Sequence, residues 1–524
     1  MKINKPVRLK GMRISVNFYK AKNGISGQIL LLKNGISWQN YGKNNRISAF
    51  PLDLMENMIY LCTELNLKIM LERKFTQYLE RFLKEEPNKI LLVNGARQIG
   101  KSYLIRYIGQ KLFTHFVEIN LKEDKEGERV FADVRTSNDL YMRLSNYYSE
   151  PLGDKSDTLI FLDEIQSYPH LLTLLKFLNQ ESRYRFIASG LQLGIALSQT
   201  PSVPLGSVSI KQMYPLDFEE FLWATGISKE WIGKMKDCFV REEALDENTH
   251  RIIMQRFQYY LLVGGLPEAV NRYLEDRNML RVRQVHADIR SLYRIDASQY
   301  DDEHKLMIRR IYDLIPSNLE NKKKRIVYKN IENKKGKTFS DYADEFEYLS
   351  NSGVALEVAA ISNPCFPLSE SEQKRLVKLY LNDVGLLTYL LYNLNVNAVL
   401  QDHKSINLGT VYESVVAQEL AAHGFKLRYY DNKQKGEVDF LIDDFNSLTV
   451  LPIEVKSGKD YTEHSALTKF LETPDYSVDR AIVFSNERKV YKKKGVTYFP
   501  IYYCMYLQNQ FLGEDVILPE LEPI

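Results

Sequence analysis

Cysteine is scarce in this 524-residue chain: there are four, Cys62, Cys238, Cys365 and Cys504, each more than 100 residues from the next. No C-x-x-C pair exists, which disfavours a metal knuckle or a dithiol redox motif. No apolar run approaches the ~20 residues that a membrane-spanning helix requires. The N-terminus also lacks the apolar segment of a secretory signal peptide. These absences predict a reduced, cytoplasmic protein with no membrane partner.

Acidic residues are absent from the first 52 positions, which carry ten lysines and arginines. Because the whole chain has 70 basic and 67 acidic residues, the remainder holds 60 basic and 67 acidic residues, a net charge of −7. Such a segment could contact nucleic acid or an acidic partner. A weakly packed extension, or a natural start at Met70, is the simpler interpretation. We treat residues 1–69 as a basic N-terminal extension of uncertain order.

A phosphate-binding loop is the most informative motif, because residues 95–102 match G-x-x-x-x-G-K-[ST], the Walker A pattern. An apolar strand-like run precedes the motif and a helix-like run follows it, which is the setting that it requires. Backbone N–H groups and the helix N-terminus would surround a polyphosphate. Lys101 is expected to reach the β- and γ-phosphates of ATP, and the Ser102 hydroxyl to hold Mg²⁺. The predicted nucleotide-binding residues are Gly95, Ala96, Arg97, Gln98, Ile99, Gly100, Lys101 and Ser102.

Two carboxylates follow a second buried strand, over residues 158–162, as in a Walker B motif. Asp163 is the predicted Mg²⁺ ligand, and Glu164 is predicted to polarise the water that attacks ATP. Ser189, at the tip of a third strand, is a candidate sensor of the γ-phosphate, although Ser-Gly also suits an ordinary turn. Strands alternating with helices over residues 70–225 predict a P-loop NTPase domain, a parallel sheet with flanking helices. Its ligand would lie beyond the carboxyl ends of the strands.

The middle of the chain, residues 226–372, reads as mostly helical. Residues 322–337 contain eight basic residues and a single acid, Glu332. Residues 338–361 are interpreted as a helix, a turn at Asn351-Ser352-Gly353 and a second helix. This pattern weakly favours a winged-helix-like unit, which binds DNA in some proteins and only packs in others. Nucleic acid, DNA rather than RNA, is therefore a candidate partner.

A second carboxylate set marks residues 373–524. Asp439 lies on one expected strand, Glu454 and Lys456 share a face of the next, and Glu413 lies on an expected helix. Three carboxylates and a lysine can bind Mg²⁺ and activate a water near a phosphodiester. This D…E-x-K pattern predicts an α/β restriction-endonuclease-like (PD-(D/E)xK) domain, with Asp439 and Glu454 as metal ligands and all four residues as the catalytic set. A solvated hairpin edge is the alternative, and the pattern does not predict retained cleavage.

Read together, these motifs resemble a bacterial and archaeal family of AAA-superfamily ATPases with a helical, winged-helix-like middle and a C-terminal domain of unknown function 4143. The resemblance spans about residues 70–510 and implies ATP binding and a five-stranded parallel sheet. In two places the chain departs from the family pattern: Gly206-Ser207 replaces Gly-Arg, and Ala188-Ser189-Gly190 replaces Thr-Gly-Ser. The first departure puts the arginine finger in doubt, and the second puts the sensor role of Ser189 in doubt. The matching motifs lie at residues 95–102, 162–166, 214–221, 264–267 and 378–386.

The sequence thus predicts an ATP-binding, Mg²⁺-dependent P-loop ATPase whose nucleotide state controls a C-terminal nuclease-like domain. Two alternatives stay open. One is a metal-dependent nuclease regulated by ATP. The other is a nucleic-acid or protein interaction module with an inactive nuclease core. No pattern in the sequence indicates an oligomeric state.

Overall fold

The computed structural model describes residues 70–148, 151–194, 206–297, 304–401, 406–458, 461–476 and 478–509. Within the basic extension it also describes the backbone of three antiparallel strands in the order β1-β2-β3. These are β1 (Asn4–Leu9), β2 (Met12–Ala21) and β3 (Gly24–Leu32). The other residues of that extension lie outside the described part of the chain.

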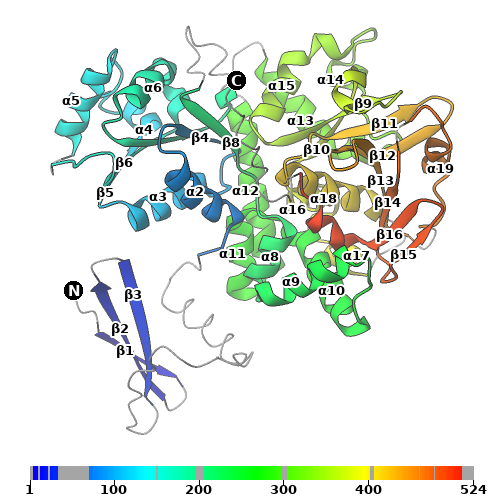
Figure 1. Cartoon of the computed structure of the whole chain (residues 1–524), viewed down its shortest axis with the longest axis horizontal. Coiled ribbons are helices and arrows are strands. Elements are labelled where there is room, and N and C mark those ends of the chain that lie inside the picture. Colours follow the sequence, from blue (N-terminus) through cyan, green and yellow to red (C-terminus); the bar gives the residue numbers. More distant parts are fainter. Residues whose placement is uncertain are drawn as a thin grey trace, which may run out of the picture.

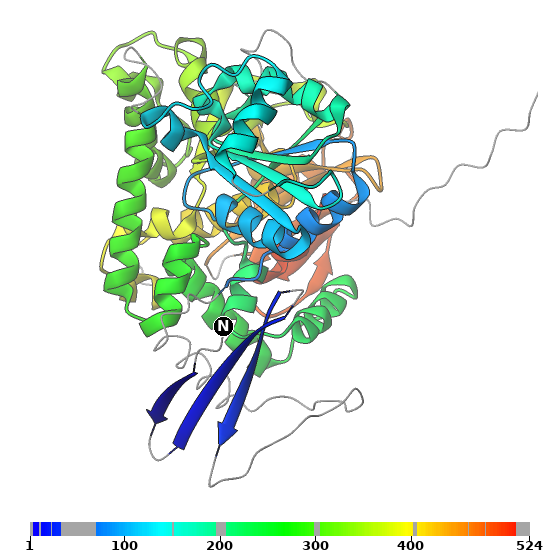
Figure 2. The same ribbon diagram turned by 90° about the vertical axis from the view of Figure 1, so that its left-hand side faces the viewer.

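A five-stranded parallel sheet in the order β5-β6-β7-β4-β8 forms the first large unit. Its central strands are buried along their whole length, as expected of apolar runs covered by helices on both faces (Figure 2). The predicted parallel sheet is confirmed. Its strands are β4 (Ile90–Asn94), β5 (His115–Asn120), β6 (Thr158–Asp163), β7 (Arg185–Gly190) and β8 (Val208–Gln212). The flanking helices are α2 (Lys74–Glu85), α3 (Lys101–Leu112), α4 (Leu121–Glu126), α5 (Ser137–Tyr147) and α6 (Pro169–Glu181).

Helices fill the middle of the chain, and α12 runs between the two sheet-containing halves (Figure 1). Two of the family-like motifs meet here: the Asp383 carboxylate accepts the Gly265 N–H at 2.7 Å and the Leu386 N–H at 3.0 Å. Burial raises the pKa of Asp383 to about 6, against these backbone donors. The helices are α8 (Phe218–Ala224), α9 (Lys229–Val240), α10 (Glu247–Val263), α11 (Pro267–Asp276), α12 (Met279–Ala297), α13 (Lys305–Glu320), α14 (Tyr328–Glu332) and α15 (Ala343–Asn351).

The helix expected after Gly353 is wrong, because this segment is the strand β9 (Ala355–Ile361). It pairs antiparallel with β10 (Glu372–Leu381) and parallel with β11 (Arg428–Asn432). A short apolar run does not distinguish a helix from a strand, and here the neighbours on both sides decide in favour of the strand. A winged-helix identity for this region stays a prediction.

The second large unit is an eight-stranded mixed sheet in the order β10-β9-β11-β12-β13-β14-β16-β15. The sequence boundary drawn at 372/373 falls inside β10, after its first residue, and separates the rest of that strand from β9, its paired neighbour in this sheet. The further strands are β12 (Gly436–Asp444), β13 (Thr449–Lys456), β14 (Ala481–Ser485), β15 (Tyr491–Lys493) and β16 (Val496–Pro500). The helices are α16 (Val384–Tyr392), α17 (Val396–Leu400), α18 (Leu408–Ala422), α19 (Ser465–Leu471) and the 3₁₀ turn η4 (Ile501–Tyr506).

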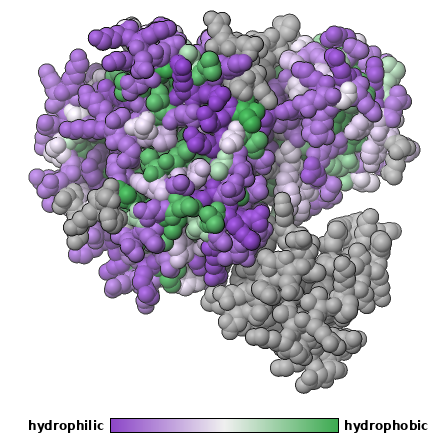
Figure 3. Space-filling view, turned by 180° about the vertical axis from the view of Figure 1, so that it is seen from behind, coloured by the Kyte–Doolittle hydropathy of each residue, from purple (hydrophilic) through white to green (hydrophobic). Residues whose placement is uncertain are grey.

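One continuous apolar core joins the halves, with members in β4, α10, α18 and η4. The face seen in Figure 3 is mainly hydrophilic, with small separate apolar patches. Among the described helices, none combines the length and the apolar character needed to cross a membrane.

Candidate functional site

The phosphate-binding loop connects β4 to α3 at the carboxyl edge of the parallel sheet. Three of its residues adopt positive φ, Gly95 at +152°, Gln98 at +63° and Gly100 at +92°. A Cβ on Gly95 would lie 2.5 Å from the Met213 carbonyl oxygen, so only glycine fits there. The loop ends on the first residue of α3, Lys101, whose helix N-terminus adds positive partial charge.

The Lys101 side chain bends back over this loop. Its Nζ donates to the carbonyl oxygens of Gly95 and Ala96, both at 2.8 Å. Burial lowers the pKa of Lys101, while the Glu164 and Asp163 carboxylates act in the opposite direction. The ammonium is therefore held within the loop that would surround a phosphate.

Oxygen ligands for a magnesium ion gather at the ends of β6 and β7. Ser102 Oγ donates to Asp163 Oδ2 at 2.6 Å, and the Ser189 hydroxyl donates to the other oxygen of Asp163. Mg²⁺ prefers oxygen ligands and is usually held by one or two protein groups together with phosphate oxygens. The hydroxyl of Ser102 and the carboxylate of Asp163 fit such an ion. Ser189, the candidate sensor, is fully buried beside them.

Glu164 begins the turn after β6 in the left-handed conformation, at φ +54°. Its Oε2 accepts Gln166 Nε2 at 2.5 Å and lies 3.9 Å from Arg97 Nη2. Arg97 also pairs with Asp296, a residue of α12. The structure thus brings Glu164, the predicted water-polarising residue, to the phosphate-binding loop.

Residues of the middle region cover this loop, and sequence reasoning did not assign them to the site. The Tyr293 hydroxyl donates to the Arg97 carbonyl at 3.1 Å, and Asn94 Nδ2 donates to the Asn351 carbonyl at 3.0 Å. Gly353 follows in the same turn, between α15 and β9. The only sequence signal was Asn351-Ser352-Gly353, interpreted as a helix cap.

A substitution at Gly353 tests how closely that turn must approach the phosphate-binding loop. A Cβ there would lie 2.8 Å from Gln212 Nε2 and 3.2 Å from the Ala96 nitrogen, at φ +72°. We expect Gly353→Ala to lower the free energy of unfolding by about 1–3 kcal/mol, since strain and crowding add. Nucleotide affinity should fall as well. Thermal unfolding and a nucleotide titration measure the two effects.

Gly336→Ala is the matched control, because Gly336 also has positive φ, +84°, but no atom of the described residues lies within 4 Å of the added Cβ. Its free energy of unfolding should fall only by the amount due to the strained positive φ, and its nucleotide affinity should be normal. Equal losses in the two variants would contradict a close contact between the turn and the loop.

A cavity of about 230 Å³ opens beside the loop, between α3 and α11. Its apolar wall includes Leu71, Ile99 and Met213, and its polar residues include Asn271 and Arg272. The Asn271 Oδ1 atom is buried and has no hydrogen-bond partner within the described part of the chain. A larger cavity of about 410 Å³ lies between α9 and the C-terminal sheet, and neither carboxylate set lines it.

The four residues of the second set lie on neighbouring elements of the C-terminal half. Glu413 is on α18, Asp439 on β12, and Glu454 and Lys456 on β13. Lys456 Nζ is 2.8 Å from Glu454 Oε1, and the Val455 N–H donates to Asp439 Oδ2 at 2.8 Å. Burial, reinforced by the charges of Glu413 and Glu454, raises the pKa of Asp439. The three carboxylates and the lysine are thus within electrostatic reach of one another.

Two further residues enter this second set, and neither was foreseen. Lys324, from the basic run, pairs with Glu413, and the Tyr380 hydroxyl donates to Glu413 Oε2 at 3.1 Å. Burial alone would lower the pKa of Lys324, but the charges of Glu413 and Asp439 outweigh it and raise that pKa. Two buried carboxylates and a partly buried one suit a divalent ion, but ammonium groups already pair with two of them, Lys324 with Glu413 and Lys456 with Glu454.

Comparisons with known families agree with part of this description. Residues 87–222 match an AAA domain, residues 254–398 a domain of unknown function (DUF8612) and residues 408–504 another (DUF4143). The predicted AAA-type P-loop ATPase domain and domain of unknown function 4143 are therefore confirmed, while the endonuclease-like nature of the latter stays a prediction. No curated protein is significantly similar to the chain.

Solved structures give only distant likenesses. One is the Thermotoga maritima RuvB Holliday junction branch migration motor, 16% identical, covering 54% of this chain and 89% of that one, with a TM-score of 0.26. Another is a single-substitution variant of that RuvB, 16% identical, covering 58% and 89%, with a TM-score of 0.25. At these TM-scores the likenesses carry no argument about this chain.

Proposed function

We propose that the AAA domain at residues 87–222 binds and hydrolyses ATP with Mg²⁺, and that the bound nucleotide controls the C-terminal half of the chain. The observation that carries the proposal is the convergence of Lys101, Ser102, Asp163 and Glu164 around one loop of N–H groups at a helix N-terminus. This arrangement suits a triphosphate and its metal ion.

Each residue then has a distinct role. The loop N–H groups and the Lys101 ammonium bind the β- and γ-phosphates, and Ser102 and Asp163 hold Mg²⁺, which neutralises the charge that develops on the phosphates. Glu164 orients the attacking water and accepts its proton. Ser189 fixes the orientation of Asp163 through its hydrogen bond.

In this proposal the adenine ring would occupy the cavity of about 230 Å³ beside the loop. Apolar side chains of Leu71, Ile99 and Met213 would contact its faces, and the unpaired Oδ1 of Asn271 would accept its amino group. Because Asn271 is on α11 and Ile99 is in the loop, adenine would join the parallel sheet to the helical middle.

A short series of contacts connects the phosphate-binding loop to the second carboxylate set, and it supports control of the C-terminal half by the nucleotide. Gly353 packs on the loop, β9 begins two residues later, and Leu356 of β9 is in register with Tyr380 of β10. The Tyr380 hydroxyl donates to Glu413 in the second carboxylate set. A shift of the loop on nucleotide binding would therefore move a strand that ends at that set. Physical proximity alone does not demonstrate coupling, so it must be measured.

The proposal is tested by measuring ATP hydrolysis and amide hydrogen exchange on the full chain. We expect Mg²⁺-dependent phosphate release from ATP, and slower amide hydrogen exchange in β9 and β10 when a non-hydrolysable ATP analogue binds. Absence of nucleotide binding would contradict the whole proposal. Binding that leaves β9 and β10 unchanged would contradict only the control of the C-terminal half.

A second candidate activity is Mg²⁺-dependent phosphodiester cleavage at Glu413, Asp439, Glu454 and Lys456. The supporting observation is their convergence on adjacent elements. Asp439 and Glu454 would hold the metal ion, and Lys456 would stabilise charge on the attacking hydroxide. Lys324 pairs with Glu413, so its side chain would have to move away before the Glu413 carboxylate could also contact a metal ion.

Replacing Lys324 tests this candidate. We expect Lys324→Ala to nick plasmid, single-stranded DNA or RNA several-fold faster than the wild type with Mg²⁺ or Mn²⁺, because it uncovers a carboxylate ligand. Lys323→Ala, which alters an exposed neighbour in the same basic run, should leave the rate unchanged. Asp439→Ala should remove all cleavage.

No nicking by Lys324→Ala, or equal nicking by Asp439→Ala, would eliminate the nuclease candidate. The remaining alternative would then be a nucleic-acid or protein interaction module with an inactive nuclease core. Binding that weakens steeply with salt would indicate nucleic acid as its partner, and a flat dependence would indicate a protein.

A further inference from the structure

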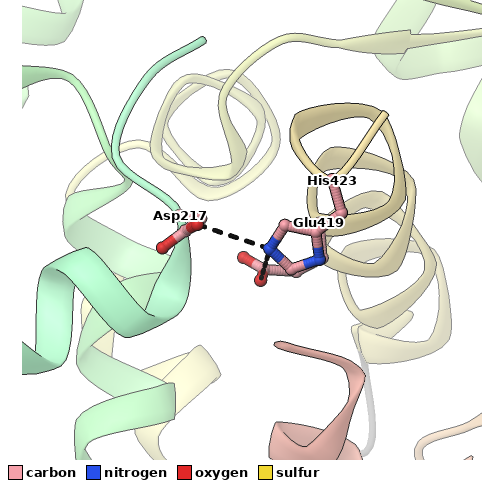
Figure 4. Close-up of side chains that lie close together, drawn as sticks. All are labelled: Asp217, Glu419 and His423. Carbon is pink, nitrogen blue, oxygen red and sulfur yellow. Dashed lines mark hydrogen bonds and ion pairs between the residues drawn. The ribbon is translucent and has the colours of Figure 1, made fainter. Parts of the chain in front are cut away.

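Three metal-ligating side chains from distant parts of the sequence point toward one another in Figure 4. Asp217 immediately precedes α8, Glu419 lies in the last turn of α18, and His423 is the residue that follows this helix, four positions after Glu419. One ligand atom of each lies within 4.8 Å of the other two. His423 Nε2 is 3.4 Å from Asp217 Oδ2 and 3.8 Å from Glu419 Oε2. This cluster is separate from both carboxylate sets described above.

Glu419 is the least satisfied member of the cluster. Its side chain is 0% exposed, and its Oε1 accepts the Phe218 N–H at 2.8 Å. Its Oε2, the atom that faces His423, has no hydrogen-bond partner in the described part of the chain. A buried, unpaired carboxylate oxygen is costly, and such atoms are rare in folded proteins. A cation beside this oxygen would satisfy it.

The charges around the cluster do not balance. Lys74 Nζ is 2.7 Å from both Asp217 and Glu219, and Arg73 pairs with Glu220 at 3.0 Å. With Glu419, four carboxylates face two cations, which leaves two negative charges when all are ionised and His423 is neutral. Lys74 is shared by Asp217 and Glu219, Arg73 pairs with Glu220, and among the described residues Glu419 has no lysine or arginine partner. One divalent ion would restore neutrality.

The ligand types select the class of ion. An imidazole nitrogen with two carboxylate oxygens suits Zn²⁺ and related transition metals better than Mg²⁺, which prefers oxygen alone. Asp217 can still ligate, because Lys74 and the Glu220 N–H occupy only two of the roughly four lone-pair positions on its carboxylate.

We propose that Asp217, Glu419 and His423 bind a divalent transition-metal ion of the Zn²⁺ type. The ion joins the end of the AAA domain to α18 of the domain that matches DUF4143. It acts as a structural link between two parts of the chain and is independent of the proposed ATP site. The buried residue Cys504 lies on η4, which packs against both α8 and α18.

The experiment counts metal on tag-free, full-length protein that has been stripped with a chelator and dialysed against Zn²⁺. We expect one tightly bound zinc ion per chain and a higher melting temperature with zinc than without it. Glu419→Gln keeps the shape and the acceptor for Phe218, and it should weaken zinc binding by about tenfold or more. His423→Ala should do the same, while His115→Ala, a half-buried histidine on β5, should bind zinc normally.

Asp439→Asn is measured in parallel, because the second carboxylate set is another source of bound zinc. Zinc lost in Asp439→Asn but kept in Glu419→Gln would overturn the proposal, as would no tight zinc in the wild type. Cobalt in place of zinc adds a spectroscopic readout: tetrahedral d–d bands that vanish in Glu419→Gln support the site. Unchanged bands in that variant contradict it.

Discussion

Lys101→Ala is expected to reduce ATP affinity by at least about 100-fold. The ammonium is buried in the loop and donates two hydrogen bonds to it, and phosphate oxygens would replace those acceptors. Charge-assisted hydrogen bonds contribute roughly 1.5–3 kcal/mol each, so losing two corresponds to two orders of magnitude or more. Titration with a fluorescent ATP analogue in Mg²⁺ measures the change.

Lys111→Ala is the matched control, since Lys111 lies near the other end of α3 and pairs at the surface with Glu80. It should bind the analogue as the wild type does. Thermal unfolding without nucleotide verifies that both variants are folded. Equal affinity of folded Lys101→Ala and wild type would show that the nucleotide binds elsewhere or not at all.

Glu164→Gln should separate binding from turnover. A general base contributes about 10²–10⁴-fold to a rate, so phosphate release should fall by that factor. ATP affinity should stay near that of the wild type, because Glu164 binds no phosphate in the proposed arrangement and Gln retains an acceptor for Gln166. Phosphate release under saturating ATP and the same analogue titration give the two numbers.

The control for this substitution is Glu123→Gln, an exposed acid on α4, just after the neighbouring strand β5. Its turnover should be unchanged. If Glu164→Gln hydrolyses ATP at the wild-type rate, the base must be another group, and Glu164 is then a partner of Arg97 with a structural role.

The parts of the nucleotide site that lie close together in sequence could be predicted, because a strand, a loop and a helix form locally. Lys101, Ser102, Asp163 and Glu164 were all expected at one edge of the sheet. The residues that cover the loop were not foreseen: Asp296 pairs with Arg97 across 199 positions. No local pattern encodes such a contact, since it depends on how the middle helices pack.

The second carboxylate set was likewise predicted only in part from the sequence. The strand pattern placed Asp439 and Glu454, but Lys324 was seen only as one member of a basic run. It reaches Glu413 across 89 positions because α13 packs against β10 of the C-terminal sheet. The strand β9 was mistaken for a helix for a related reason. Its identity depends on pairing with β10 and β11, which lie later in the chain.

The shared sheet limits where the polypeptide can be divided for laboratory work. A fragment that starts at residue 373 would lack β9, the strand that pairs with both β10 and β11 in the described sheet. One side of β11 would then present its unpaired N–H and C=O groups to other molecules. Bare strand edges recruit further strands, and such fragments self-associate and precipitate. A truncation that begins before α13, near residue 304, keeps the whole sheet together and is the better starting point for isolating the C-terminal half.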